Sequence, residues 1–380
     1  MSLLRNGLLT VVLILGLHIG PSQADTSTIP AIAARAWILV DPASGQALAA
    51  EKADEQVEPA SLTKLMTAYM VFAALRDRGL TLSQVVPVSE KAWRAGGSKM
   101  FIEPRKPVTV DELITGMIVQ SGNDACIALA EVIAGTEENF AQLMNREAQR
   151  LGMKNSSFTN ASGLPDSKHF STARDLALLA SALIRDFPQE YEKYYRIKEY
   201  RYNNITQRNR NRLLWLDPNV DGVKTGHTEN AGYCLIASAK RGQRRLLSVV
   251  LGTSSDSVRA QEAQKLLNVG FQQWDTVRLY EKSKPVGQLE IWKGASRQLP
   301  TGVAQDLSLS VPKGQAERVR AELLSQQPLV APIAAGQRVG TIRVTLDEKP
   351  LAEFPAIAME SVAAAGMFGR AWDSMRLWFK

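Results

Sequence analysis

A serine and a lysine stand three residues apart in Ser61-Leu-Thr-Lys64, at the start of an apolar-periodic stretch that spans residues 62–75. On a helix this spacing places both side chains on one face, one turn apart. A lysine amine whose pKa is lowered by burial and neighbouring positive charge can accept the proton of a serine hydroxyl. The positive dipole end and free N–H groups of a helix start would stabilise an oxyanion beside Ser61. The pair therefore predicts nucleophilic catalysis by Ser61 with Lys64 as the general base.

This spacing is a weak signal by itself, because the sequence contains a second copy, Ser310-Val-Pro-Lys313. The second copy lies in a stretch of strand-like alternation and contains a proline, which does not suit a helix interior. We therefore interpret Ser310 and Lys313 as a chance match.

Two further motifs follow the first pair. Ser121-Gly-Asn123 stands at the start of a helical pattern over residues 122–134, and Lys224-Thr-Gly226 lies in a strand-like stretch. Alone, Ser-Gly-Asn is most often a helix cap, and Lys-Thr-Gly is usually a surface strand end. Together, Ser-x-x-Lys, Ser-x-Asn and Lys-Thr-Gly are the ordered motifs of the serine penicillin-binding and β-lactamase superfamily. The chain resembles that superfamily.

The likeness extends to residues 97–98, 118–126, 151–153, 158–164 and 221–228. These segments resemble the low-molecular-mass penicillin-binding proteins that are serine D-alanyl-D-alanine carboxypeptidases of peptidase family S11, most closely the membrane-anchored penicillin-binding protein 5 type. The resemblance implies an α/β catalytic domain of the serine β-lactamase and transpeptidase kind, with an antiparallel sheet flanked by helices. It also implies a small, mostly β C-terminal domain and a terminal amphipathic helix.

The resemblance assigns catalytic roles to three residues. Ser61 would attack the carbonyl of the penultimate D-alanine, Lys64 would be its general base, and Ser121 would relay protons. The implied reaction removes the terminal D-alanine from peptidoglycan stem pentapeptides through an acyl-serine intermediate, with water as the final acceptor and no metal or cofactor. β-Lactam antibiotics would acylate the same serine as substrate mimics.

Five further residues are expected to bind substrate. Asn123 would position the substrate amide and the lysine base, and Lys224 would supply positive charge. Thr225 would hydrogen-bond the terminal carboxylate of the stem peptide. Gly226 would let the substrate backbone approach the strand edge. The backbone N–H of His227 would complete an oxyanion hole with that of the nucleophile.

Four alternatives are weighed against this reaction. A D,D-endopeptidase would cut cross-links by identical steps, but such relatives usually lack the terminal domain. A class A β-lactamase uses a glutamate for fast deacylation, and residues 165–175 contain none. A non-catalytic tether that organises wall enzymes would not need the intact motifs. A Ser-His-Asp hydrolase is disfavoured, because no Gly-x-Ser-x-Gly elbow exists and only His169 and His227 follow residue 24.

Periodicity predicts the elements that must hold these motifs. A turn at residues 41–45 joins two strands, and helices then separate them from a second group of strands. A sheet built from both ends of residues 25–275 would result. The expected helices span residues 61–78, 111–119, 122–134, 138–151 and 172–185, and the expected strands span residues 36–40, 46–50, 222–226, 232–239 and 246–252.

Residues 276–355 have a different hydrophobic pattern. Apolar residues alternate with period two between Gly and Pro turns, which predicts a small β domain. One short helix is expected near residues 315–324. A linker at about residues 350–360 is expected to lead into the terminal segment, residues 356–380.

The two ends of the chain predict its location. Residues 1–24 combine an early arginine, an apolar run over residues 8–17 and a small-x-small cleavage site, which is the pattern of a signal peptide. The last fourteen residues form an amphipathic helical pattern, which could dock on its own domain but fits a bilayer interface better. The mature chain is therefore expected in the periplasm, peripheral on the outer face of the cytoplasmic membrane. The apolar side of the terminal helix would contain Phe368, Ala371, Trp372, Met375, Trp378 and Phe379.

The composition and charge set further limits. The 380 residues are 45% hydrophobic and 22% charged, which excludes a disordered or multispan membrane protein. The net charge of +7 suits an anionic partner. Residues 194–215 interleave aromatic and basic side chains. Secretion of the chain disfavours nucleic-acid binding by this segment. We expect the segment to be a solvated basic flank near the site that touches wall polymers or acidic head groups.

Two smaller features concern residues near the expected site. The stretch His169–Asp175 resembles the loop that closes the bottom of the family's site, but a cap on the following helix through Ser171 or Thr172 is an equal alternative. The cysteines, Cys126 and Cys234, are expected to be buried free thiols near the site.

Overall fold

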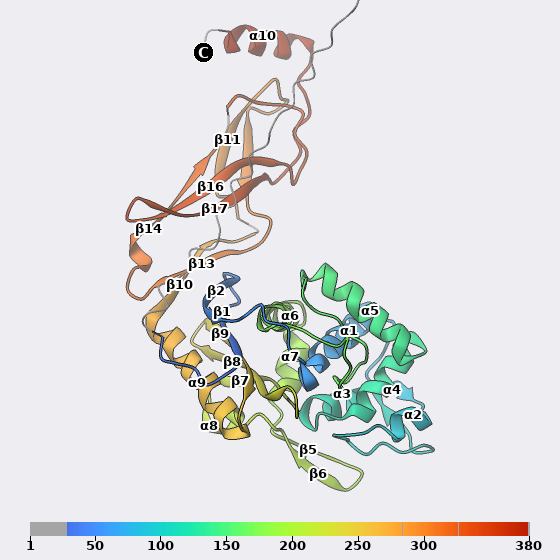
Figure 1. The fold of residues 1–380 in the computed structure, drawn as a ribbon. Helices are drawn as coiled ribbons and strands as arrows, with labels where there is room; N and C mark the ends of the chain where they lie inside the picture. Colours follow the sequence, from blue (N-terminus) through green and yellow to red (C-terminus); the bar gives the residue numbers. More distant parts are fainter. Residues whose placement is uncertain (1–28, 283, 326, 379–380) are drawn as a thin grey trace, which may run out of the picture.

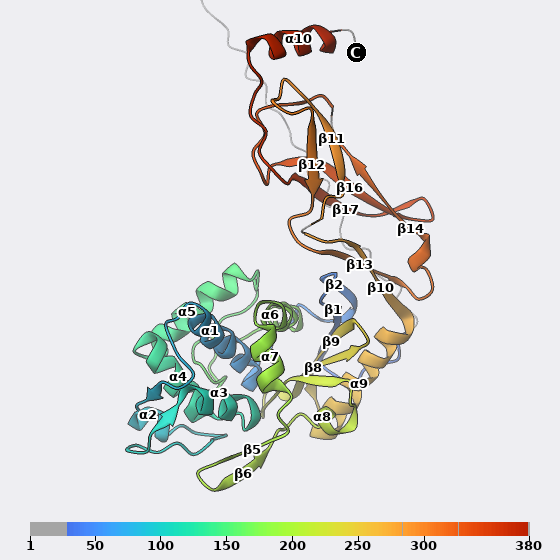
Figure 2. The same ribbon diagram turned by 180° about the vertical axis from the view of Figure 1, so that it is seen from behind.

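The computed structural model describes residues 29–378 except 283 and 326, so the predicted signal peptide lies outside the described residues. Two bodies follow each other along the chain (Figures 1 and 2): a broad N-terminal domain of helices and sheet, and a narrow β domain. A last helix, α10 (Met367–Leu377), lies at the end of the β domain farthest from the N-terminal domain (Figure 1).

A five-stranded antiparallel sheet forms the centre of the N-terminal domain, in the order β2-β1-β9-β8-β7. Its strands come from both ends of the domain, as the sequence predicted. Successive side chains point to opposite faces, so Leu39 packs in the cluster under α9 while Ile38 packs in the larger core on the other face. The bounds are β1 (Ala36–Asp41), β2 (Gln46–Glu51), β7 (Val220–Thr228), β8 (Gly232–Arg241), β9 (Arg244–Thr253) and α9 (Asp256–Gln273).

A layer of helices covers the face of this sheet opposite α9. Side-chain caps explain several helix starts, because Thr109, Thr136 and Thr172 each accept a hydrogen bond from the N–H three residues later. The bounds are η2 (Ala60–Thr63), α1 (Lys64–Arg76), α2 (Glu90–Trp93), α3 (Val110–Val119), α4 (Asn123–Ala134), α5 (Glu137–Arg150), α6 (Ala173–Asp186) and α7 (Pro188–Tyr195). Small elements outside the layer are β3 (Val85–Val86), β4 (Val108–Thr109), β5 (Glu199–Tyr202), β6 (Ile205–Arg208) and α8 (Leu213–Leu216).

The expected helices and strands of this domain are confirmed to within a few residues. Helices α7 and α9 are additions that the periodicity did not predict. In α9 the buried positions, such as Ala260, Ala263 and Leu267, alternate with many polar residues, so the apolar stripe is thin. The signal that marks its start is Ser255, whose side chain caps the helix.

The β domain is confirmed, with two corrections. The helix expected near residues 315–324 is wrong, since a short turn η3 (Ala316–Arg318) leads directly into a strand, β14 (Val319–Leu324). Along β14 the side chains alternate in burial, and the strand pairs with β16. The remaining strands are β10 (Trp274–Tyr280), β11 (Gly287–Trp292), β12 (Gln298–Gly302), β13 (Leu307–Pro312), β15 (Leu329–Val330), β16 (Arg338–Leu346) and β17 (Lys349–Ala358).

The linker expected at residues 350–360 is also wrong, because β17 occupies most of it. The strand contains two prolines, Pro350 and Pro355. Strand β17 pairs with β16 along its length but with β12 only at Ile357 and Ala358. The prolines therefore lie where the second edge of β17 is unpaired, and a missing N–H costs nothing at such an edge.

The two domains meet around the buried carboxylate of Asp41, at the end of β1. Asp41 accepts hydrogen bonds from Ser310 Oγ at 3.0 Å and from Thr276 Oγ1, and Arg244 lies 3.6 Å away. Gln46 Oε1 accepts the backbone N–H of Ser310 at 2.6 Å. The strand predicted for the second Ser-x-x-Lys copy is confirmed, and its Ser310 makes structural contacts between the domains.

Candidate active site

The short helix η2 presents Ser61, and α1 begins at Lys64 one turn later. Lys64 is almost completely buried, with 2% of its surface exposed. Its Nζ lies 3.0 Å from Ser61 Oγ, 2.7 Å from Asn123 Oδ1 and 2.7 Å from the carbonyl oxygen of Ser162. The predicted nucleophile and base are therefore in direct contact.

These contacts suit a neutral amine. Burial is the largest cause, and together with the nearby Arg210 guanidinium it lowers the pKa of Lys64 to about 8 against the opposing charge of Asp124. A neutral amine can donate its two hydrogens to the carbonyl-type oxygens of Asn123 and Ser162. Its lone pair is then left for the hydroxyl of Ser61, which is the arrangement that a general base requires.

The Ser-Gly-Asn motif forms the sharp entry to α4. Ser121 has a φ of +60°, an uncommon conformation for a residue with a side chain. Asn123 donates from Nδ2 to the carbonyl of Gly96 at 2.7 Å, and its N–H donates to the carbonyl of Ser98 at 2.7 Å. Gly97 has a φ of +74°, and a Cβ there would lie 2.9 Å from Asn123 Nδ2. Glycine therefore lets residues 96–98 close onto the asparagine.

The Lys-Thr-Gly motif lies on β7, an edge strand of the sheet. Lys224 is buried, and its Nζ donates to Ser121 Oγ at 3.0 Å and to the carbonyl of Thr225 at 3.1 Å. Burial, followed by the positive charges of Lys64 and Arg210, holds the pKa of Lys224 well below its usual range. Ser121 thus accepts a hydrogen bond from Lys224, the second buried lysine of the site.

A cavity of about 390 Å³ opens over these motifs. The side chains of Lys64, Asn123 and Lys224 lie buried behind it. Every other site residue predicted from the sequence lines the cavity. The lining residues are Ser61, Gly97, Ser98, Ser121, Arg210, Thr225, Gly226, His227, Tyr233 and Arg259.

Two arginines of this lining have no role in the sequence prediction. Arg259 comes from α9, donates to the carbonyl of Gly226 at 3.1 Å, pairs with Asp256 and lies over the ring of Tyr233. Arg210 was seen only as part of a basic flank. No sequence signal marks Arg259, because only the packing of α9 behind β8 and β9 brings it to the cavity.

Asp124 is a further residue that the sequence reasoning missed. Its buried carboxylate accepts the backbone N–H groups of Met100, Phe101 and Ile102 at 2.8–3.2 Å. These bonds fix the segment after Ser98 to the start of α4. The signal was its position, since an acidic residue in the first turn of a helix is stabilised by the helix dipole.

The stretch His169–Asp175 supports the site from below and also caps a helix. His169 is buried, and its Nε2 lies 2.8 Å from Thr63 Oγ1, next to the lysine base. Burial lowers the pKa of His169 to about 4, so its ring is neutral at physiological pH. Thr172 caps α6 through its side chain. The stretch therefore contacts the site through His169 and also caps the following helix through Thr172.

The two cysteines are free and buried, as predicted. Burial raises the pKa of Cys126 to about 12 and that of Cys234 to about 11, so both are neutral thiols at physiological pH.

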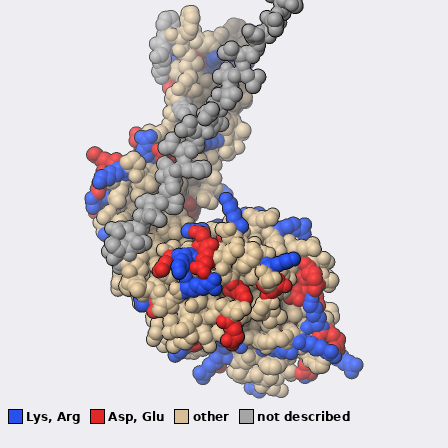
Figure 3. Space-filling model, viewed as in Figure 1, with Lys and Arg blue, Asp and Glu red and all other residues tan. Residues whose placement is uncertain are grey.

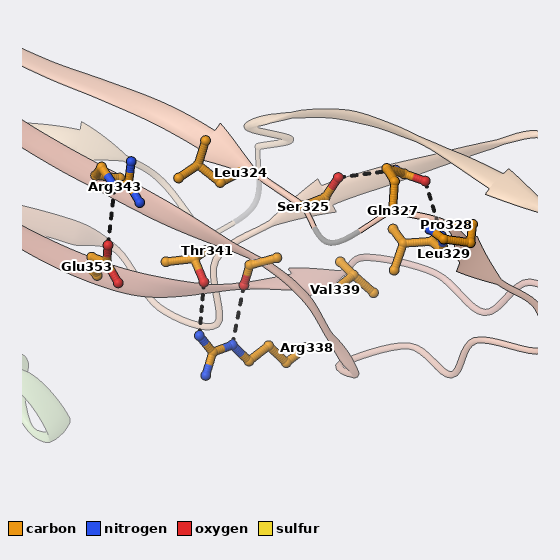
Figure 4. Close-up of a pocket in the computed structure, with 11 residues that line it drawn as sticks. Leu324, Ser325, Gln327, Pro328, Leu329, Arg338, Val339, Thr341, Arg343 and Glu353 are labelled. Atoms are coloured by element: carbon orange, nitrogen blue, oxygen red, sulfur yellow. Dashed lines mark hydrogen bonds and ion pairs between the residues drawn. The ribbon is translucent and has the colours of Figure 1, made fainter. Parts of the chain in front are cut away.

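A larger cavity, of about 910 Å³, lies in the β domain (Figure 4). Its arginines already have partners, because Arg338 donates to the carbonyl of Gly340 and to Thr341 Oγ1, and Arg343 pairs with Glu353. Its lining holds no serine beside a lysine or histidine base. The described lining of this larger cavity therefore lacks the pair of nucleophile and base found at the smaller cavity.

Comparison with known proteins gives the same family for both domains. A family model described as D-alanyl-D-alanine carboxypeptidase, peptidase S11, matches residues 23–255. The chain belongs to this family. A second model, the penicillin-binding protein 5 C-terminal domain, matches residues 274–364.

Individual family members are similar over most of the chain. D-alanyl-D-alanine carboxypeptidase DacC of Escherichia coli is 45% identical over 93% of this chain and 90% of its own. The crystal structure of penicillin-binding protein 5 from Haemophilus influenzae has a TM-score of 0.84 and 40% identity over 88% of this chain and 99% of its own. Penicillin-binding protein D2 of Listeria monocytogenes, solved in an ampicillin-bound form, has a TM-score of 0.59 and 32% identity over 64% of this chain and 98% of its own.

Proposed function

We propose that this S11 family member removes the terminal D-alanine from peptidoglycan stem pentapeptides by acyl-serine catalysis. The contact that carries the proposal is the 3.0 Å approach of a buried lysine amine to Ser61 Oγ. Ser61 Oγ attacks the carbonyl carbon of the penultimate D-alanine while Lys64 accepts the hydroxyl proton. The C–N bond then breaks, and the departing D-alanine amine takes up a proton. Water next attacks the acyl-serine, which releases the shortened peptide and restores the Ser61 hydroxyl.

The other residues act on charge and position. In this proposal Ser121, which accepts a hydrogen bond from Lys224, passes the proton from the Lys64 amine to the leaving group. Asn123 holds the lysine base and, in the complex, the substrate amide. Ser61 and His227 line the same cavity, and in this proposal their backbone N–H groups form the oxyanion hole.

The carboxylate of the terminal D-alanine enters the basic side of the cavity. Thr225 hydrogen-bonds this group. The negative charge of the carboxylate favours the protonated form of Lys224, which then supplies positive charge behind it. Arg210 and Arg259 line the same cavity and extend its positive field. Gly226 lies on an edge strand, where the substrate backbone can approach closely.

β-Lactams should acylate Ser61, because their strained amide presents a carbonyl to the same nucleophile. The ampicillin-bound structure of the Listeria relative supports this. Cleavage of cross-links by the same steps, weak β-lactamase activity and a non-catalytic scaffolding role remain the alternatives, and no contact in the site favours any of them over carboxypeptidase activity.

We also propose that the chain works in the periplasm, at the outer face of the cytoplasmic membrane, with α10 lying in the bilayer interface. Asp373 accepts the N–H of Lys293 at 2.7 Å, and Arg376 lies over the ring of Trp292, so the polar side of α10 rests on the β domain. The apolar side is left uncovered, which favours the interface over docking on the chain itself. Its exposed members are Met367, Phe368, Trp372, Met375 and Trp378.

None of the helices in the described part of the chain is long and apolar enough to cross a membrane. An interfacial helix does not need such a span, because it lies in the plane of the headgroups.

The decisive experiment measures D-alanine released from a diacyl-Lys-D-Ala-D-Ala peptide by the full chain and by Ser61→Ala. Release should vanish in the variant, because Ser61 supplies the one hydroxyl that bonds Lys64 Nζ among the described residues. A Ser310→Ala variant, which alters the structural copy of the motif, is the matched control and should keep its activity. A folded wild-type chain that releases no D-alanine would refute the proposal, and cross-linked muropeptides would then be the next substrate.

A further inference from the structure

A second, smaller cavity lies on the other side of the segment that carries Arg210. Its volume is about 290 Å³. It is formed by the end of β6 and by α8, at the end of the N-terminal domain away from the β domain and α10 (Figures 1 and 2). Its lining residues are Arg208, Asn209, Arg212, Trp215 and Leu216.

The segment between the two cavities is rigid. Asn209 donates from Nδ2 to the carbonyl of Ile197 at 3.0 Å, and Asn211 donates from Nδ2 to the carbonyl of Gly222 on β7 at 2.9 Å. Both asparagines are buried, whereas the arginines on either side of them are exposed. This alternation leaves Arg210 in the active-site cavity and Arg208 in the neighbouring one. The two cavities are therefore held in a fixed relation.

The chemistry of the outer cavity combines an apolar face with positive charge. Trp215 is 43% exposed and Leu216 is 58% exposed. Arg208 has no acidic partner within the described ranges, while Arg212 lies 3.7 Å from Asp256. Residues 194–216 contain six basic residues and one acidic residue. On the face shown in Figure 3, Lys and Arg side chains are interspersed with acidic ones, including at this end of the domain.

We infer that this cavity, the Trp215 cavity, is an exosite for the peptidoglycan polymer whose stem peptide occupies the active site. The inference rests on the proposed function. A pyranose ring of the glycan would lie on the indole face of Trp215, which offers a large apolar surface. A carboxylate of the stem peptide would pair with Arg208, whose guanidinium can bind it through two hydrogen bonds.

Continuity with the active site and charge favour this occupant. Only the end of the stem peptide fits the catalytic cavity, so the remaining polymer must leave across the adjoining surface. A weak second contact on the same polymer becomes intramolecular and raises overall binding without changing the chemistry at Ser61. Helix α8, which forms part of the cavity, lies at the end of the molecule opposite α10 (Figure 1), and α10 is the membrane end in the proposed function.

The test compares the full chain with the double variant Arg208→Ala/Trp215→Ala on two substrates. On isolated, uncross-linked pentapeptide glycan strands, the variant should lose about tenfold in kcat/KM, mainly through KM, which corresponds to about 1.4 kcal/mol. On the diacyl tripeptide, kcat/KM should stay within about twofold, because neither residue lines the catalytic cavity. Equal effects on both substrates, or no effect on the polymer, would overturn the inference.

A matched control removes one exposed arginine and one exposed apolar residue elsewhere, Arg146→Ala/Leu178→Ala, and should leave both substrates unaffected. Acylation by a β-lactam and the melting temperature check that the variants are folded. Vesicles of phosphatidylglycerol provide the rival anionic partner. Vesicle binding that weakens in the Arg208 and Trp215 variant, with unchanged polymer turnover, would assign the cavity to lipid instead.

The outcome can be separated from failure of the proposed function. If the wild-type chain releases no D-alanine from the tripeptide, the reaction is wrong. Binding of the Ser61→Ala chain to the same glycan strands, measured by sedimentation with and without the Arg208 and Trp215 changes, then still decides the exosite. Equal sedimentation of the two chains would refute it.

Discussion

Lys64 shows at the residue scale how burial turns an ordinary lysine into a base. An exposed lysine, with a pKa near 10.4, is neutral in only about one molecule in 2500 at pH 7. With its pKa lowered to about 8, roughly one molecule in ten has a neutral amine. Lys224 is shifted in the same direction by the same burial and by the charge of Lys64. Because the two amines share one site, their titration is coupled.

The pH dependence of acylation follows from this shift. The amine must be free to accept the Ser61 proton, so the rate should rise as pH increases through about 8 and then level off. Stopped-flow acylation by a β-lactam between pH 6 and 9.5 measures this limb. The melting temperature over the same range serves as the control for folding. A rate that is constant across this range would contradict Lys64 as the base.

Gly163 shows at the element scale that the serine depends on a neighbouring loop. Gly163 has a φ of +83°, and a Cβ there would lie 1.8 Å from the carbonyl oxygen of Ala60, in the helix that presents Ser61. Ser162, one residue earlier, accepts a hydrogen bond from Lys64. The loop therefore fixes both the nucleophile and the base, and only glycine leaves room for η2.

A pair of glycine variants isolates this contact. Gly163→Ala should lower the free energy of unfolding by about 3 kcal/mol and slow acylation by roughly tenfold or more, because η2 must move. Gly152→Ala is the matched control, since Gly152 has a φ of +82° and open space at its Cβ position. It should cost only about 1 kcal/mol and leave acylation unchanged. Chemical denaturation and β-lactam acylation measure the two effects, and equal losses in both variants would rule out the steric explanation.

At the scale of the whole molecule, the β domain separates α10 from the N-terminal domain (Figure 1). The reaction and the proposed membrane contact therefore lie at opposite ends of the molecule. Deleting residues 366–380 should move the protein from the membrane pellet to the soluble fraction, because the exposed aromatic side chains of α10 are removed. Hydrolysis of the diacyl tripeptide should stay unchanged and serves as the internal control. Retention of the shortened chain on membranes would place the anchor elsewhere.

The sequence by itself determined the motifs, their order and most elements of the N-terminal domain. Local signals suffice for these, because a side chain at i+3 or a Thr cap acts within one turn of helix. The same local signals misread residues 315–324 and 350–360, where pairing with β16 decides the structure. Strand pairing depends on partners that are distant in sequence, so periodicity within a short window is a weak guide to it.

Tertiary structure alone decided three properties of the site. It buried both Lys64 and Lys224, and this burial is the main cause that lowers both pKa values, which no spacing in the sequence specifies. It brought Arg259 from α9 into the cavity. It also made Ser310 a domain contact while an identical motif at Ser61 became the candidate nucleophile. The two copies differ in their surroundings, because a serine gains a base only where the fold holds a buried amine beside it.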